Sequence, residues 1–135
     1  MRYRNIERFK YQLASDLTFE TGITGFSYKG EFLELDPRGR MLIKDGYLAD
    51  GPSGLTRDDE TNMEPAFGHD GGYELIRRCV LPLEYKDTFD RLLRKWMLEK
   101  GALEIRANYY YDFVSKFGWD SCVPGSETKD DVMEV

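Results

Sequence analysis

The chain contains one histidine, and a carboxylate and a phenol follow it in the segment HDGGY, which runs from His69 to Tyr73. Imidazole exchanges protons near neutral pH more readily than any other side chain. On a helix, His69 and Tyr73 share a face because they lie four residues apart, whereas Asp70 is turned about 100° away. The spacing therefore predicts a proton-transfer group with a phenol beside it and a carboxylate on the flank.

Three glycines lie within three positions of His69, in a segment whose other residues favour a helix. Each glycine weakens a helix interior by about 1 kcal/mol relative to alanine, so a compensating contact is expected. A glycine also lets another helix or a loop approach closely. We therefore expect Gly72 to lie against a neighbouring element that buries the imidazole and gives it a fixed partner.

The expected partner is Asp90, which lies at the margin of the apolar stripe of the next predicted helix. A short connection between the two helices predicts antiparallel packing, which would bring Asp90 to His69. A carboxylate there would fix the tautomer of the imidazole, and Tyr73 could donate a hydrogen bond to it. These three residues are candidates for general acid–base catalysis. The alternative is a buried, hydrogen-bonded pair that stabilises helix packing.

A loop rich in aspartate, glycine and serine spans about residues 49–61 and precedes the histidine. Its oxygen atoms suit a hard cation such as calcium, with Asp50 and Asp70 as predicted ligands. The spacing does not match an EF-hand, and the alternative is an ordinary solvated acidic loop. The loop also contains Ser53, a candidate nucleophile with His69 as its base, although no Gly-x-Ser-x-Gly segment surrounds it.

The elements that must position these residues form one predicted domain, residues 1–120, in two halves. Alternating apolar and polar residues from about 5 to 48 predict antiparallel strands. The clearest signal is the segment FLELDPRGRMLI, residues 32–43, where two apolar runs flank Asp-Pro-Arg-Gly. Because these four residues suit a type I turn, the segment predicts a β-hairpin.

Apolar residues at helical spacing predict three helices, at about residues 62–79, 83–100 and 102–117. The third helix is expected to face the core through Leu103, Ala107, Tyr110, Val114 and Phe117. Residues 121–135 are polar and acidic without periodicity, which predicts a C-terminal tail. Together the elements predict an α+β fold, antiparallel strands followed by three packed helices.

The net charge and the hydropathy of the chain argue against nucleic acid and membranes as its partners. The formal net charge of −6 argues against nucleic acid, because a surface that binds phosphates is normally basic. No apolar run has the length of a membrane span, and the N-terminal residues lack the apolar stretch of a secretory signal. We therefore expect no transmembrane segment, and we expect the protein to be made in a cytoplasm.

Cys79 and Cys122 form neither a disulfide framework nor a zinc motif and are expected to be free thiols.

The segment HDGGY, with Arg77 after it and Asp90 on the next helix, resembles the helix pair of the secreted phospholipase A2 family. The resemblance implies that His69 activates a water molecule, Asp70 binds calcium and Asp90 orients the histidine. It covers only the helix pair. The paired cysteines of that family are absent here, so the similarity is one of local architecture.

Most of the chain resembles a family of small proteins encoded by tailed bacteriophages and prophages. The matching features are an aspartate before a loop of glycine, serine and proline, an HD-x-x-Y helix and an aspartate on the next helix, at Asp50, Ser53, His69, Asp70, Tyr73 and Asp90. The resemblance implies a phage context but no particular activity. Together with the acidic net charge and the lack of an export signal, it favours a structural protein of the virion head, neck or tail, made in the host cytoplasm. Its partners would be other phage proteins, with copies of itself in the particle. The alternative function is a calcium-assisted His-Asp hydrolase that cleaves bonds in lipid or cell wall.

Overall fold

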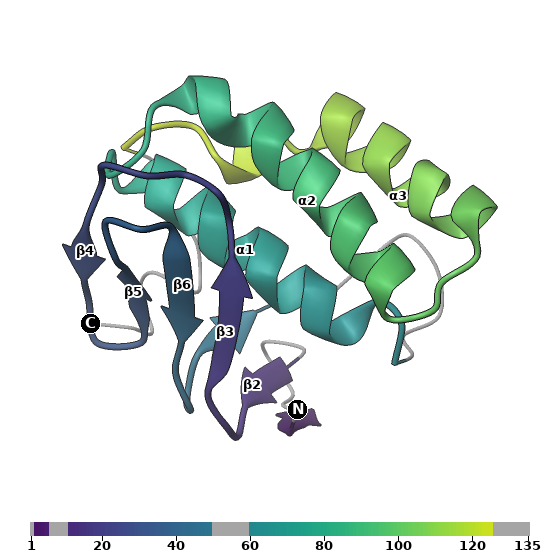
Figure 1. Ribbon diagram of the computed structural model, residues 1–135, viewed down its shortest axis with the longest axis horizontal. Coiled ribbons are helices and arrows are strands. Elements are labelled where there is room, and N and C mark those ends of the chain that lie inside the picture. Colours follow the sequence, from purple (N-terminus) through teal and green to yellow (C-terminus); the bar gives the residue numbers. More distant parts are fainter. Residues whose placement is uncertain (1, 6–10, 50–59, 126–135) are drawn as a thin grey trace. The chain divides into compact units, whose positions relative to one another are not determined.

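The computed structural model describes residues 2–5, 11–49 and 60–125. Contacts along the chain group these residues into two compact units, a strand unit within Met1–Asp50 and a helical unit within Gly51–Ser126. Antiparallel strands at the start of the chain are followed by three helices (Figure 1). The predicted α+β fold is therefore confirmed, whereas the assignment of both units to one domain stays a prediction.

The first sheet of the strand unit has three short antiparallel strands, in the order β1 (Tyr3–Asn5), β2 (Tyr11–Leu13) and β7 (Leu48–Ala49). In β2, Tyr11 and Leu13 are buried and the residue between them is half-buried. Side chains of a strand point alternately to its two faces. The period-two pattern in this part of the sequence is therefore confirmed.

The second sheet has four antiparallel strands, in the order β3 (Leu17–Glu20), β6 (Arg40–Ile43), β5 (Leu33–Leu35) and β4 (Tyr28–Lys29). Strands β5 and β6 form the predicted hairpin. Its turn is closed by a backbone hydrogen bond of 3.0 Å, which Gly39 donates to the carbonyl of Asp36. The inward side chains of these strands form the core of the strand unit, among them Leu17, Phe19, Leu33, Leu35, Met41 and Ile43.

The described residues of the helical unit, 60–125, form three α-helices and two short 3-10 turns. These are α1 (Met63–Arg77), η1 (Leu83–Tyr85), α2 (Lys86–Glu99), α3 (Glu104–Phe117) and η2 (Trp119–Ser121). Helix α2 lies between α1 and α3 (Figure 1). Every residue of α1 except Glu64 and Asp70 is buried. A helix buried on all sides belongs to the interior of a protein, so the histidine lies on an interior helix.

The third helix ends at Phe117 as predicted, but it differs from its prediction in its start and in which residues face the core. It begins at Glu104 rather than near residue 102, because the backbone of Leu103 is still extended. The prediction that Leu103 and Phe117 face the core is wrong, since they are 72% and 67% exposed. Leu103 precedes the first helical turn and Phe117 ends the last, so both lie beyond the stretch of α3 that packs on α2.

The first two helices also differ from their predicted limits. Helix α1 ends at Arg77, because Cys79 has a φ of 62°, in the left-handed region that a helix cannot include. The second predicted helix opens with the 3-10 turn η1, and α-helical structure begins at Lys86. Both cysteines are free thiols, as predicted.

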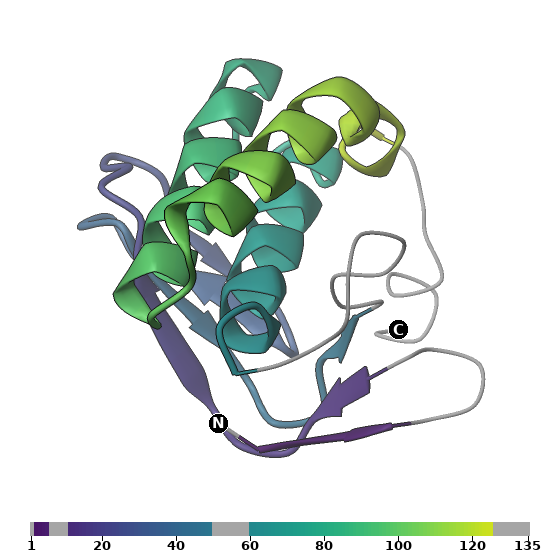
Figure 2. The same cartoon turned by 90° about the vertical axis from the view of Figure 1, so that its right-hand side faces the viewer.

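The chain that follows α3 is packed onto the helical unit, and the prediction of a tail from residue 121 is wrong for its first residues. One guanidinium nitrogen of Arg77 donates to the carbonyl of Ser121 at 2.7 Å, and the Gly125 amide donates to the carbonyl of Arg77 at 2.7 Å. Cys122 is fully buried. Figure 2 shows this yellow segment folding back at the end of α3. Residues 126–135 of the predicted tail lie outside the described residues.

In the part of the chain that the structure describes, no helix is long and apolar enough to cross a membrane.

Candidate active site

Helices α1 and α2 pack antiparallel through the predicted close contact at Gly72. Near the start of α1, Glu64 forms an ion pair with Lys100 just after α2. Later in α1, the ring of Tyr73 lies near Lys86, the first residue of α2. Between these contacts, a Cβ atom on Gly72 would lie 2.2 Å from the ring of Phe89. The glycine thus allows the approach that brings the two polar helix faces together.

This approach gathers His69, Tyr73 and Asp90 into one buried cluster. Nε2 of His69 lies 2.7 Å from Oδ1 of Asp90, and the Tyr73 hydroxyl donates to the same oxygen at 2.6 Å. The ring centroids of His69 and Tyr73 are 4.0 Å apart. His69 is 5% exposed and Asp90 is fully buried. The predicted geometry of these three residues is therefore confirmed.

Lys86 is a fourth member of the cluster that the sequence analysis missed. Its Nζ atom donates to Oδ2 of Asp90 at 2.7 Å and to the carbonyl of Val114 in α3 at 2.9 Å. Only 2% of Lys86 is exposed. Its spacing of four residues from Asp90 on one helix is a signal for an ion pair. The burial of that pair depends on α3 and could not be predicted from the spacing.

The charge of Asp90 decides how the cluster is protonated. Burial raises the pKa of Asp90, but hydrogen bonds from His69, Lys86 and Tyr73 outweigh burial and hold the pKa below its ordinary value. Burial and the adjacent Asp90 charge raise the pKa of Tyr73 far above its usual range, so the phenol stays a donor. An ionised carboxylate only accepts hydrogen bonds. Nε2 of His69 therefore carries the proton of its bond to Asp90.

This protonation leaves the second ring nitrogen of His69 as the basic atom. Among the described residues, the ring makes its hydrogen bond through Nε2 only. A neutral imidazole with its proton on Nε2 has its lone pair on Nδ1. The pairing of an oriented imidazole with a buried carboxylate is the base half of a hydrolytic triad. Chemically, the cluster can take a proton at Nδ1 and stabilise the resulting imidazolium through Asp90.

The segment after α3 closes one side of the cluster. Nζ of Lys86 lies 4.6 Å from the centroid of the Trp119 ring, within the range of a cation–π interaction. A Cβ atom on Gly118 would lie 2.3 Å from the Tyr73 hydroxyl, so the backbone passes directly over the phenol. These residues were not predicted as part of the site. No periodic signal connects them to α1, because they meet it only through the fold.

Of the remaining predicted site residues, only Asp70 lies in the part of the chain that the structure describes. Asp50 and Ser53 lie outside the described residues, so the calcium ligand and the nucleophile stay predictions. Asp70 is half-buried on α1. Within residues 2–5, 11–49 and 60–125, no three histidine, cysteine, aspartate or glutamate side chains lie close enough together to hold a metal ion.

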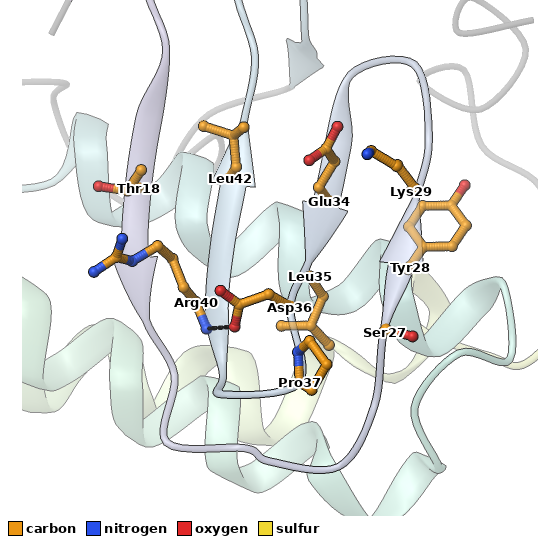
Figure 3. A pocket seen from close by; sticks show the side chains of 10 residues that line it. All are labelled: Thr18, Ser27, Tyr28, Lys29, Glu34, Leu35, Asp36, Pro37, Arg40 and Leu42. Atoms are coloured by element: carbon orange, nitrogen blue, oxygen red, sulfur yellow. Dashed lines mark hydrogen bonds between the residues drawn. The ribbon is translucent and has the colours of Figure 1, made fainter.

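A hollow of about 650 Å³ lies in the strand unit, over strands β3 to β6 (Figure 3). Three of its charged side chains, Glu34, Asp36 and Arg40, have partners within the strand unit. Oδ1 of Asp36 accepts a hydrogen bond of 3.0 Å from the Arg40 amide, and the Arg40 side chain pairs with Glu20. None of the residues predicted for the site lines this hollow. The helical cluster therefore remains the candidate active site.

Comparisons of the chain with models of protein families, with curated proteins and with solved structures found no match.

Proposed function

We propose that the protein is a hydrolase in which His69 acts as the general base and Asp90 orients it. The observation that carries the proposal is the 2.7 Å contact between Nε2 of His69 and Oδ1 of the buried Asp90, which leaves Nδ1 as the basic atom. A positioned base of this kind contributes about 100-fold to 10,000-fold to a reaction rate. The substrate class is an ester or amide of lipid or cell wall.

The reaction follows from the protonation of the cluster. Nδ1 of His69 removes a proton from a water molecule while the water oxygen attacks the carbonyl carbon of the substrate. The imidazolium that forms is stabilised by the negative charge of Asp90. His69 then returns the proton to the departing alcohol or amine as the tetrahedral intermediate breaks down. Tyr73 holds the carboxylate in place through its 2.6 Å hydrogen bond.

The experiment that tests this function compares two variants of the site with one control variant. The purified protein is assayed against phospholipid vesicles and against peptidoglycan, with release of fatty acid or of new amines as the measurement. His69→Gln and Asp90→Asn should abolish release while circular dichroism shows a folded protein. The matched control is Asp87→Asn, which changes an exposed carboxylate on the same helix and should leave the rate unchanged. Equal rates for the wild type and His69→Gln would contradict the proposal.

The access of a reagent to the imidazole of His69 can be measured directly, because the chain has one histidine. Diethyl pyrocarbonate modifies an unprotonated imidazole, and the absorbance change then reports His69 alone. The native protein should be modified, more slowly than a free imidazole because His69 is 5% exposed, and modification should remove activity. A native protein that resists the reagent until it is unfolded, and that releases no product, would contradict a role for His69 as a base.

The second candidate function is the one that the whole-chain resemblance favours, a structural protein of a phage particle that binds other phage proteins. Exposed apolar side chains of α3 favour it. Ile105 and Phe117 are 77% and 67% exposed, and with Tyr109 and Phe113 they recur every four residues. Exposed apolar surface on a folded protein commonly marks a protein interface. The proposed partner is another phage structural protein with a complementary apolar surface.

Purified particles of a phage that encodes the chain would test this second function. Mass spectrometry should detect the protein in particles, and Ile105→Glu should remove it from particles without unfolding it. His69→Gln should still be incorporated, since a structural protein needs the histidine only for stability. Particles that lack the wild-type protein would contradict the structural role. Hydrolysis that depends on His69 would support the first function whether or not the protein is in particles.

A further inference from the structure

Lys86 occupies a position that lysines rarely take, because a buried ammonium group is costly without a charge partner. It is 2% exposed, and its Nζ atom has partners on three elements. It donates to Asp90 on its own helix and to the Val114 carbonyl on α3, and it lies over the ring of Trp119. The bond to α3 and the ring above it hold the ammonium group in place independently of the carboxylate.

The three donors around Asp90 are not equivalent. Tyr73 and a neutral His69 offer dipoles, whereas Lys86 offers a full positive charge to the oxygen that the other two leave open. A fully buried carboxylate without a counter-charge tends to take up a proton. Loss of Tyr73 would remove one hydrogen bond, but loss of Lys86 would remove the counter-charge.

Protonation of Asp90 would reverse the hydrogen bond to His69. A neutral carboxyl group would donate its proton toward Nε2, which would then need its lone pair. The single proton of a neutral imidazole would move to Nδ1, the atom that has to act as the base. The charge of Asp90 thus decides which ring nitrogen of His69 is available for chemistry.

We propose that Lys86 is a positioning residue that keeps Asp90 an anionic acceptor and thereby fixes His69 in the tautomer with its proton on Nε2. The catalytic consequence rests on the proposed function, since only a base at Nδ1 makes the tautomer matter to a rate. The structural consequence does not rest on it. The tautomer can be measured in a protein that has no activity at all.

The experiment is nuclear magnetic resonance of the protein labelled with ¹⁵N-histidine. The one histidine gives one pair of ring nitrogen signals, and the unprotonated nitrogen resonates far downfield of the protonated one. In the wild type with a neutral imidazole, Nδ1 should be unprotonated and Nε2 protonated. In Lys86→Gln, which loses the charge and keeps a donor for the Val114 carbonyl, the two signals should exchange or average. Lys86→Met is the second variant if the first does not fold.

Three control variants separate the effect of the counter-charge from the effect of packing. Tyr73→Phe removes a hydrogen bond to the same carboxylate oxygen and should keep the wild-type tautomer. Arg91→Met removes the cation of an exposed i, i+4 pair on α2 and should change neither nitrogen signal. Lys86→Arg, which keeps a positive charge at this position, should keep the wild-type tautomer. A wild-type tautomer in both Lys86→Gln and Lys86→Met would overturn the proposal, as would a wild type with its proton on Nδ1.

The activity readout distinguishes this inference from the proposed function. If the wild type hydrolyses a substrate, Lys86→Gln should lower kcat with KM unchanged, because a wrong tautomer costs up to about 10,000-fold in kcat in a triad. If no hydrolysis is found but the tautomer follows Lys86, the proposed function fails and the positioning role stands. If hydrolysis is found but the tautomer ignores Lys86, the positioning role fails and the function stands.

Discussion

The ring of Phe89 occupies the space where a side chain at position 72 would begin. A Cβ atom built on Gly72 would lie 2.2 Å from one ring carbon of Phe89 and 2.4 Å from two others. Neither residue is polar, yet their contact sets the distance between α1 and α2. That distance places His69 within a hydrogen bond of Asp90. The presence of Gly72 within the segment HDGGY is therefore explained by packing rather than by chemistry.

Gly72→Ala should destabilise the protein although alanine favours a helix. Alanine would add about 1 kcal/mol of helix propensity. Overpacking against a fixed aromatic ring typically costs about 1–3 kcal/mol, so we expect a net loss in the free energy of unfolding. Urea denaturation followed by circular dichroism measures it. In a Phe89→Leu background the cost of Gly72→Ala should shrink, and an equal cost in both backgrounds would show that the ring is not the obstacle.

Asp90→Asn should be far more costly to stability than Asp87→Asn. Asp90 is fully buried against Lys86, and removal of one partner of a buried pair costs about 3–5 kcal/mol because the other charge stays unpaired. The side chain of Asp87 is 56% exposed in its pair with Arg91, so its loss should change stability little. Thermal unfolding of the two variants measures the difference. Similar losses in both would mean that Lys86 is neutral or solvated.

The acid stability of the protein should depend on Asp90. Burial raises the pKa of Asp90 but its three donors lower it further, so the pKa in the folded protein lies below the ordinary 3.8. The unfolded chain then binds this proton more readily than the folded protein does. The contribution of Asp90 to the free energy of unfolding is complete at pH values above its ordinary pKa. This contribution is lost as the pH falls through the pKa of Asp90 in the folded protein.

Urea titrations between about pH 5 and pH 2 measure how steeply the free energy of unfolding changes with pH. One proton taken up on unfolding changes the free energy of unfolding by about 1.4 kcal/mol per pH unit. In Asp90→Asn the pH dependence of the free energy of unfolding should be shallower, by up to about 1.4 kcal/mol per pH unit. An Asp90→Asn variant with the wild-type slope would indicate that the carboxylate is not stabilised by its donors.

The two cysteines should react at different rates. Cys79 is exposed, whereas Cys122 is fully buried and burial raises the pKa of its thiol to about 11. Because the thiolate is the reactive form, a disulfide reagent at pH 8 should modify one thiol quickly and the second only after unfolding. Cys79→Ser should remove the fast phase alone. Two fast thiols in the native protein would mean that the segment after α3 does not cover Cys122.

The local elements could be predicted because their signals are periodic. The hairpin of β5 and β6 follows from two alternating runs around Asp36-Pro-Arg-Gly39. The shared helical face of His69 and Tyr73 follows from a spacing of four residues. The predicted contact with Asp90 needed one more assumption, that a short connection packs two helices antiparallel. These inferences use distances along the chain, which helix and strand geometry convert directly into positions.

The tertiary structure alone decided which charge faces Asp90 and what closes the site. Lys86 is polar and stands at the start of its helix, so its sequence position fits solvent as well as a core. It is buried because Val114 and Trp119, 28 and 33 residues further on, come to lie over it. Such contacts depend on which faces of separate elements meet. No spacing along the chain encodes that choice, because it is made by the packing of the whole helical unit.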